Sequence, residues 1–194
     1  LERIFFHDIM NTAGGLRGFL EIINDSSPAE VHEYTKVALY LSEKLIEELR
    51  AQRELIAAEN NELAVSFKPF SSIEILNEVQ LLYSHHDVAK EKKIVTNNDA
   101  EDTIMISDKT LMRRILGNLV KNALEASDAN DIVTLNCIVK NNSVSFTVNN
   151  KKIMPRNVQM QIFQRSFSTK GEGRGLGTYS IKLISERYLH GTVN

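Results

Sequence analysis

The chain has 194 residues, of which 42% are hydrophobic and 25% charged, a composition typical of a soluble globular protein with one large domain or two small ones. A net charge of −2 offers no basic field for nucleic acid, and the single cysteine, Cys137, excludes an internal disulfide and a multi-cysteine metal site. The sequence holds neither a signal peptide nor an apolar run near the roughly 20 residues of a membrane span, so we expect a cytoplasmic fragment without direct membrane contact, whose longer parent protein could carry a tether elsewhere.

Residues 1 to about 60 are predicted to form two helices. The apolar residues of the first helix follow the alternating spacing of three and four that marks a coiled-coil seam: Phe6, Ile9, Ala13, Leu16, Leu20 and Ile23. Ser27, Pro28 and Glu30 form a capping box with proline at the first helical position, so a second helix begins there. A hairpin of this size buries too little surface to be stable alone, and we expect a second copy to complete a four-helix bundle.

From about residue 63 the sequence changes to short strands that alternate with helices. We expect helices over 73–83 and 110–126 and after the glycines near residue 177, and strands over 93–96, 103–106, 132–139 and 143–148. Residues 140–142 make the turn between the last two strands. This order predicts the α+β class: a helical hairpin that forms a dimeric four-helix bundle, followed by an α/β sandwich with helices on one face of a sheet.

The segment FFHDIMN, residues 5–11, places His7 and Asn11 one helical turn apart on a shared face. Asp8 can hydrogen-bond one ring nitrogen of His7 and leave the other nitrogen as a nucleophile. Gly14 and Gly18 continue this face and could leave room for another protein's backbone beside the histidine. On these residues alone, a surface histidine and a helix kink at the glycines are the simpler interpretation.

The predicted helix over 110–126 carries Asn118, Asn122 and Glu125 as one polar stripe. Two amide oxygens one turn apart can hold a hydrated Mg²⁺, an ion that prefers oxygen ligands and usually binds together with substrate phosphates. Lys121 can reach a phosphate from the same helix. A solvated helix face is the alternative interpretation.

A glycine-rich segment precedes the last predicted helix. Four of the nine glycines of the chain fall within the seven residues 171–177. Glycines let backbone amides approach phosphates closely, and the N-terminus of the following helix favours an anion. Lys170 and Arg174 add positive charge where a triphosphate would lie. The segment is neither a Walker loop nor a dinucleotide-binding fingerprint.

Four motifs together resemble the catalytic core of the sensor histidine kinases of two-component signalling. FFHDIMN resembles the H-box of this family, LMRRILGNLVKNALEAS its N-box, IFQRSFSTK its F-box and GEGRGLG its second glycine box. Each motif alone is a weak signal, but the four occur in the order and at the spacing of the family across nearly the whole chain.

The resemblance implies that residues 1–62 are the dimerisation and histidine-phosphotransfer domain of a homodimer, and that residues 63–194 are an ATP-binding domain of the Bergerat type shared with gyrase and the Hsp90 chaperones. His7 would take the γ-phosphate of ATP, with Asp8 as the polarising base, and pass it to an aspartate on a response-regulator receiver domain. Asn11 matches the position that orients water for dephosphorylation of that partner.

The resemblance also implies the residues that bind ATP and Mg²⁺. Asn118 and Asn122 would meet the metal and the phosphates, and Phe163 and Phe167 would anchor a mobile lid over the nucleotide. The remaining residues expected to contact the nucleotide are Lys121, Asn150, Lys170, Gly173, Arg174, Gly175, Leu176, Gly177 and Thr178.

The sequence departs from the family at residues 148–155, VNNKKIMP. Family members carry D-x-G-x-G here, and its aspartate accepts a hydrogen bond from the adenine amine. In this chain Asn150, or less readily Asn149, takes the place of the aspartate and can still accept this bond without charge. Such a bond contributes roughly 0.5–1.5 kcal/mol when neutral and about 1.5–3 kcal/mol when charged, so we expect ATP affinity to fall without vanishing.

Two functions are compatible with these motifs, and a third class is weighed against them. The first is a working autokinase with a variant adenine contact, which the N-box, F-box and second glycine box favour. The second is a phosphatase-biased or degenerate kinase that binds the receiver but uses ATP poorly. The third, an ATP-driven conformational machine like the gyrase and chaperone relatives, needs a glutamate base where this chain has Asn118.

Overall fold

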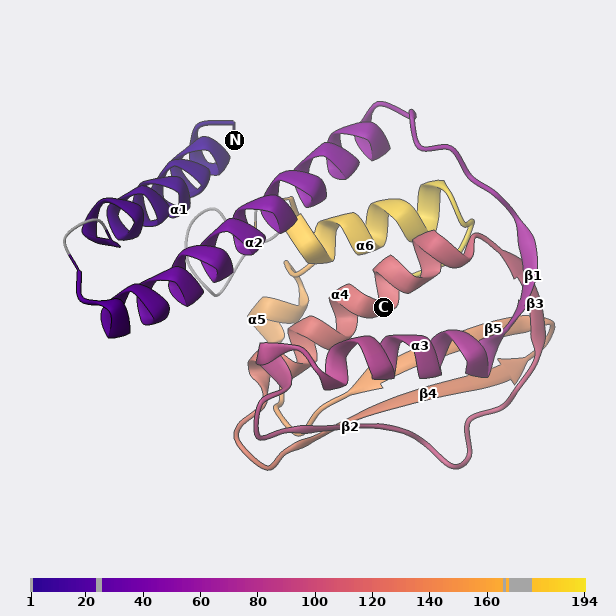
Figure 1. The fold of residues 1–194 in the computed structure, drawn as a ribbon. Coiled ribbons are helices and arrows are strands. Elements are labelled where there is room, and N and C mark those ends of the chain that lie inside the picture. The colour runs from indigo at the N-terminus through magenta and orange to yellow at the C-terminus, as the bar shows by residue number, and fades with distance from the viewer. Residues whose placement is uncertain (1, 24–25, 166, 168–175) are drawn as a thin grey trace. The chain divides into compact units, whose positions relative to one another are not determined.

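The computed structural model describes residues 2–23, 26–165, 167 and 176–194, and it leaves the side chains of residues 2–8 and of Ala29 undescribed. The chain divides into two compact units, residues 1–63 with 166–176 and residues 64–165 with 177–194. The first unit contains a helical hairpin and the second contains the β-strands (Figure 1). Within the described part of the chain, no helix combines the length and the apolar character of a membrane span.

The helical hairpin consists of α1 (Glu2–Ile23) and α2 (Pro28–Glu59). The backbone N–H of Ser27 donates to Glu30 Oε2 at 2.9 Å. The hydrogen bond that the glutamate side chain accepts in the predicted capping box is therefore present. Phe19 of α1 packs against Tyr34 of α2 with ring centroids 6.0 Å apart. A Cβ on Gly15 would lie 3.7 Å from Leu41, an ordinary van der Waals contact between α1 and α2. These contacts place one apolar face of α2 against α1.

The second unit begins with β1 (Lys68–Ser71), α3 (Ser72–Ser84) and the 3₁₀ turn η1 (Asp87–Ala89). The following elements are β2 (Lys93–Thr96), β3 (Ile104–Ser107), α4 (Lys109–Ala126), β4 (Ile132–Lys140), β5 (Ser143–Asn149), α5 (Arg156–Gln159) and α6 (Leu176–Arg187). The expected helices and strands are present, with ends that differ by a residue or two. The sequence did not predict β1 or α5, which are only four residues long.

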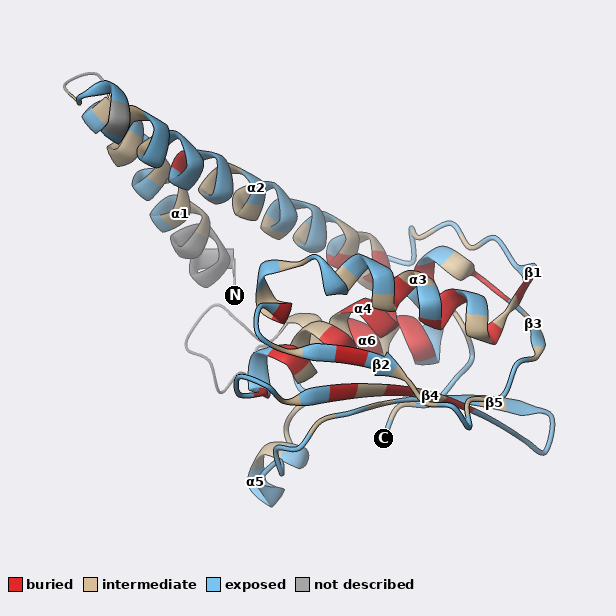
Figure 2. Ribbon diagram, turned by 60° about the horizontal axis from the view of Figure 1, so that its bottom comes forward, coloured by how far each residue is buried: buried red, intermediate tan, exposed pale blue. Residues whose placement is uncertain are grey.

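Two sheets organise this unit. β2 pairs in parallel with β4, which pairs antiparallel with β5 in the order β2-β4-β5. The turn between β4 and β5 places Asn141 and Asn142 at φ values of 50° and 62°, a conformation that asparagine tolerates better than most residues. β1 and β3 form a separate antiparallel pair. Helices α3, α4 and α6 lie over one face of the three-stranded sheet (Figure 2), which confirms the predicted α+β arrangement.

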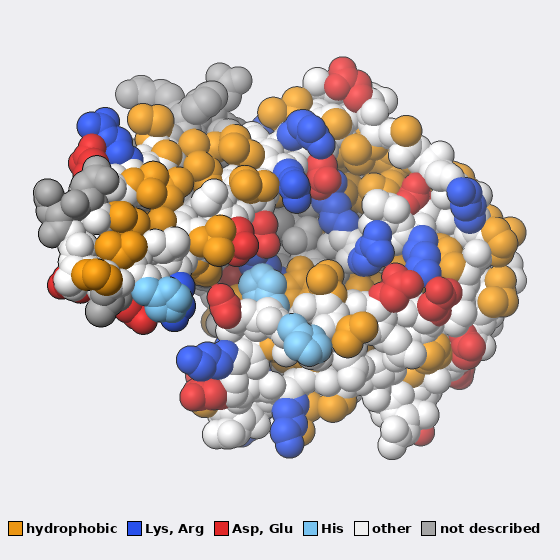
Figure 3. Space-filling model, viewed as in Figure 1, with side chains coloured by type: hydrophobic (Ala, Val, Ile, Leu, Met, Phe, Trp, Pro, Cys, Tyr) orange, Lys and Arg blue, Asp and Glu red, His pale blue; other side chains and the backbone are white. Residues whose placement is uncertain are grey.

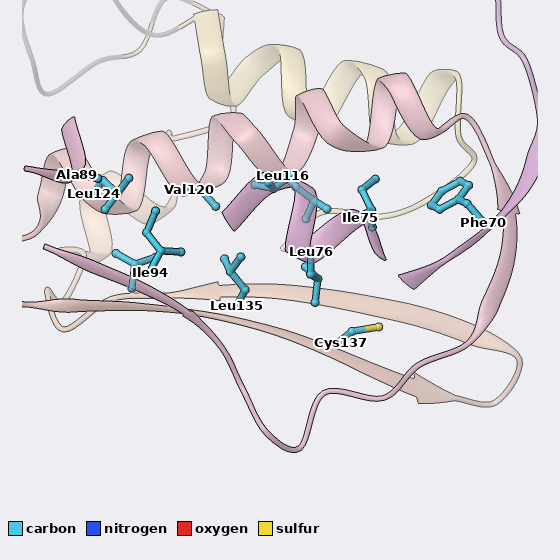
Figure 4. Packing of buried hydrophobic residues seen from close by; sticks show 12 residues of the cluster. Phe70, Ile75, Leu76, Ala89, Ile94, Leu116, Val120, Leu124, Leu135 and Cys137 are labelled. Atoms are coloured by element: carbon cyan, nitrogen blue, oxygen red, sulfur yellow. The ribbon is translucent and has the colours of Figure 1, made fainter. Parts of the chain in front are cut away.

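A closed hydrophobic core fills the space between these helices and the sheet. Leu76 and Val79 of α3, Leu116 and Val120 of α4, and Leu135 of β4 are at most 1% exposed. Cys137, in the same cluster, is buried as well (Figure 4). The core therefore fixes the position of α4, which carries Asn118 and Asn122, relative to β4 and β5.

Candidate functional site

Helix α4 carries the expected metal ligands Asn118 and Asn122 and the expected phosphate contact Lys121. Its N-terminus is capped by Asp108, whose Oδ1 accepts from the backbone N–H of Leu111 at 2.9 Å. The other oxygen of this buried carboxylate accepts from the N–H of Ser66 at 2.7 Å. Gly117 allows α3 to approach closely, because a side chain there would lie 3.1 Å from the Tyr83 hydroxyl. The N-cap and the close packing explain why this helix begins and lies where it does.

The polar side of α4 bears Asn118, Lys121 and Asn122, all of them half-buried. Asn118 and Asn122 stand one turn apart, so both amide oxygens can serve one ion on the same side of the helix. Oxygen donors of this kind fit Mg²⁺, which completes its shell with water and substrate phosphates. Among the described residues there is no group of three or more His, Cys, Asp or Glu side chains that could hold a metal. A metal ion here would therefore need phosphate or water ligands in addition to the amides.

The C-terminal end of α4 holds the segment that departs from the family pattern. Asn150 Nδ2 donates to the backbone carbonyl of Ala123 at 3.3 Å, and the hydroxyl of Ser127 donates to the same carbonyl at 2.7 Å. Lys152 Nζ lies 2.7 Å from Asp128 Oδ2, in the loop that follows α4. The structure thus brings Asn150 to the helix that carries Asn118 and Asn122.

Lys152, in the segment 148–155, lowers the pKa of the aspartate that it contacts. The pKa of Asp128 is below its ordinary value, first because Lys152 donates a hydrogen bond to the carboxylate and then because of its positive charge. The pKa of Lys152 is raised for the same reason. Neither residue was expected at the site, since a sequence with two lysines at 151–152 does not reveal which acidic residue they meet. The only hint was the pair of aspartates at 128 and 131 before the next strand.

The F-box segment lies against α6 through two contacts between a cation and a ring. Lys182 Nζ lies 5.9 Å from the centre of the Phe163 ring, and the guanidinium of Arg165 lies 6.0 Å from the centre of the Tyr179 ring. Each segment thus supplies one cation and one ring, at the outer limit of cation–π attraction. Phe167 is half-buried. The role of Phe163 as a lid anchor stays a prediction, and the sequence did not predict its contact with Lys182 of α6.

The remaining expected residues are placed only in part. Leu176, Gly177 and Thr178 form the first turn of α6, where backbone N–H groups lack helical partners and favour an anion. His7, Asp8 and Asn11 lie in α1, and Asn11 is exposed one turn after His7. The side chains of His7 and Asp8 lie outside the described part, as do four of the expected nucleotide-binding residues as a whole: Lys170, Gly173, Arg174 and Gly175.

Comparison with known proteins gives consistent matches. Residues 108–194 match the family model of the GHKL domain. Over 173 residues the chain is 26% identical to sporulation kinase C of Bacillus subtilis, a match that covers 88% of this chain and 39% of that protein. The fold is similar to the Acinetobacter baumannii histidine kinase AdeS, with a TM-score of 0.71 and 21% identity over 92% of this chain and 85% of that one.

The histidine kinase ThkA provides a third comparison. Its catalytic domain aligns with a TM-score of 0.56 and 29% identity over 62% of this chain and 80% of that domain. ThkA in complex with the response regulator protein TrrA aligns with a TM-score of 0.63 and 22% identity over 84% of this chain and 48% of that one. The chain spans less than half the length of the curated relatives it matches, 39% of sporulation kinase C and 46% of the sensor protein DegM of Bacillus sp..

Proposed function

We propose, from the premise that this chain is a histidine kinase catalytic core with a GHKL domain at residues 108–194, that it transfers the γ-phosphate of ATP to His7 and then to an aspartate of a response regulator. The observation that carries the proposal is the polar side of α4. This helix presents Asn118 and Asn122 one turn apart and holds Asn150 at its C-terminal end. A helix face that is merely exposed to solvent would not need Asn150, which comes from the end of a strand far away in the sequence.

The residues of α4 and α6 would position the triphosphate. Asn118 and Asn122 would hold Mg²⁺, which neutralises phosphate charge when it is bound. Lys121 would approach the phosphates from the position directly before Asn122 on α4. The first turn of α6, with Gly177 and Thr178, would offer its backbone N–H groups to the phosphate oxygens. Phosphoryl transfer depends mainly on such positioning and charge stabilisation.

His7 would act as the nucleophile. One ring nitrogen attacks the γ-phosphorus in line, the bond from this phosphorus to the bridging oxygen breaks, and ADP leaves with the electron pair. Asp8 would hold the other ring nitrogen and stabilise the positive charge that develops on the imidazole. The phosphoryl group then passes to a carboxylate of a receiver domain. The complex of ThkA with the response regulator protein TrrA supports a partner of this class.

A homodimer is supported by an exposed apolar stripe on α2. We define the outer stripe as Leu39, Ile46, Leu49 and Ile56, which are separated by seven, three and seven residues and are 44–60% exposed. This spacing is that of a coiled-coil seam. Figure 3 shows hydrophobic side chains gathered over the helical hairpin. A second copy that covers the outer stripe would complete the four-helix bundle.

A second candidate function is dephosphorylation of the regulator. Asn11 is exposed on α1 one turn after His7 and could orient a water molecule toward a phosphoaspartate. The absence of an aspartate and glycines at residues 148–155 would favour this activity if ATP were bound poorly. The two functions share the hairpin and differ in their dependence on ATP.

Incubation with γ-labelled ATP and Mg²⁺ tests the proposal. We expect acid-labile label on the wild type and none on His7→Gln, because the P–N bond forms only on this imidazole. His32→Gln, an exposed histidine of α2, is the matched control and should keep the label. Label that survives in His7→Gln, or a folded wild-type dimer that never becomes labelled, contradicts the autokinase. In the latter case, loss of phosphate from a phosphorylated receiver domain, sensitive to Asn11→Ala, would identify the phosphatase.

A further inference from the structure

The buried carboxylate of Asp108 serves two parts of the α/β unit at once. Oδ1 accepts from the N–H of Leu111 and caps α4, while Oδ2 accepts from the N–H of Ser66 in the linker between α2 and β1. We propose that Asp108 is a positioning residue, which fixes the linker to the start of α4 and so sets the length of the hinge between the hairpin and the α/β unit. The inference rests on the proposed phosphotransfer and concerns how the ATP-binding unit is tethered to the helix that carries His7.

The beginning of the linker is held by the end of α2. Asn60 is the C-cap of this helix, and Asn61 follows it with a φ of 62°. The backbone N–H of Glu62 then donates to the carbonyl of Ala57 at 2.8 Å. A left-handed residue followed by an N–H that returns to the last turn is the Schellman ending of a helix. The chain is therefore anchored to α2 as far as residue 62.

The other end of the linker is held by Asp108. Ser66 lies two residues before β1, and β1 lies beside β3, the strand that leads directly into Asp108 (Figure 1). Only residues 63–65, which we call the hinge, separate the two anchored N–H groups, and the chain divides into its two units between residues 63 and 64. Without the bond to Ser66, the segment before β1 would comprise residues 63–67. Two further residues would extend its reach by roughly 7 Å.

A carboxylate suits both tasks of position 108. Both oxygens of an ionised aspartate accept hydrogen bonds, whereas an asparagine offers one acceptor oxygen and an amino group that only donates. The two backbone donors and the positive end of the α4 dipole offset the cost of burying the charge. Asp108→Asn should therefore keep either the cap of α4 or the bond to Ser66, but not both. The cap and the hinge are coupled through this one side chain.

The length of the hinge affects phosphotransfer but not ATP binding. Because the hinge tethers the ATP-binding unit to the hairpin, the effective concentration of bound ATP near His7 depends on its length. For a flexible tether this concentration falls roughly as the −3/2 power of length, so five residues in place of three should lower the transfer rate about twofold. The affinity for ATP should stay the same, because the linker carries none of the residues expected to contact the nucleotide.

Ser66→Pro tests the hinge, because proline has no N–H to donate to Asp108. With saturating γ-labelled ATP and Mg²⁺, we expect the initial rate of labelling to fall about two- to fivefold while the Kd for ATP does not change. Ser66→Ala keeps the N–H and is the matched control. Insertion of two glycines between Val65 and Ser66 lengthens the hinge and leaves the bond in place, and it should lower the rate as Ser66→Pro does. An unchanged rate in either variant, or a loss of ATP affinity that accounts for the loss of rate, overturns the inference.

Amide exchange without nucleotide, followed by NMR, tests the two bonds of Asp108 independently of the proposed function. We expect Asp108→Asn to speed exchange at Ser66 or Leu111, or at both, by at least about tenfold, the range that one hydrogen bond to a charged group supplies, while the core amides of β4 keep their rates. Asp99→Asn, the same charge change at an exposed position of this unit, is the control and should leave both amides as in the wild type. A wild type that is never labelled contradicts the proposed function, and amide exchange then decides the role of Asp108 alone. Unchanged protection of both amides in Asp108→Asn overturns it.

Discussion

Along α2, the side chains of Leu39, Ile46 and Leu49 are 44–60% exposed, whereas Leu76 and Leu116 of the α/β unit are at most 1% exposed. Both units contain amphipathic helices, so the difference does not lie in local helix propensity. It lies in what each helix has to pack against. The α/β unit covers its sheet with its own helices and closes its core, while α2 has one apolar face against α1 and a second one that its own unit leaves uncovered. The stability of the α/β unit should thus be a property of one chain, and that of the hairpin a property of two.

The largest expected loss of stability comes from a substitution that creates a cavity in the core of the α/β unit. Leu76→Ala removes a fully buried side chain between α3 and β4, and we expect the free energy of unfolding of this unit to fall by about 2–5 kcal/mol. Hydrogen exchange resolved by peptides should report the loss in residues 64–165 while the hairpin keeps its protection. Leu81→Ala, 66% exposed on the same helix, is the control and should change stability by at most about 0.5 kcal/mol. Equal losses in both units would show that they do not fold independently.

A smaller effect is expected in the hairpin, and it should depend on protein concentration. Ile46→Ala shortens a member of the outer stripe, and we expect the dissociation constant of the dimer to rise about ten- to a hundredfold, the loss that follows from a partly buried aliphatic side chain. Sedimentation equilibrium measures this directly. Val37→Ala, which falls outside the spacing of the stripe, should leave the constant within about twofold. A chain that stays monomeric at all concentrations, or a dimer that Ile46→Ala does not weaken, would contradict the paired hairpin.

The elements that the sequence predicted well are those with local signals. The start of α2 follows from Ser27, Pro28 and Glu30, which lie within four residues of one another, and β2 was predicted at its observed bounds. The strand β1 was not predicted, because its pairing with β3 joins residues about 36 positions apart and its own sequence contains a proline. Strand pairing over such a separation is a tertiary contact, which periodicity does not report.

The features of the candidate site also divide into those with a local sequence signal and those without one. The polar stripe of Asn118 and Asn122 was visible because helical spacing places residues four apart on one side. The contact of Asn150 with Ala123 was not visible, because it joins the end of β5 to the end of α4 across 27 positions and uses a backbone carbonyl, which has no sequence signature. The phosphotransfer roles of His7 and Asp8, and the assignment of residues 1–62 and 63–194 to two functional domains, stay predictions.

The smallest expected effect concerns the pH dependence of the hairpin. The pKa of Glu30 is below its ordinary 4.5, because the hydroxyl and then the backbone N–H of Ser27 donate to its carboxylate. A lowered folded-state pKa means that the carboxylate contributes stability above the unfolded value and loses this contribution as the pH falls through the folded value. We therefore expect Glu30→Gln to speed amide exchange in the first turn of α2 at pH 6, and to match the wild type once Glu30 is protonated.

Glu74→Gln is the matched control for this experiment, because the pKa of Glu74 is lowered by Lys109 in the α/β unit. Its loss should also shrink toward low pH, but it should appear in α3 and α4 rather than in α2. Comparison of each variant with the wild type at the same pH removes the intrinsic pH dependence of amide exchange. A Glu30→Gln difference that is as large at pH 3 as at pH 6 would show that the carboxylate charge does not stabilise the start of α2. If both variants instead changed amide exchange in the same peptides, the hairpin and the α/β unit would share one unfolding transition. The difference in side-chain burial between α2 and the core of the α/β unit would then correspond to no difference in stability.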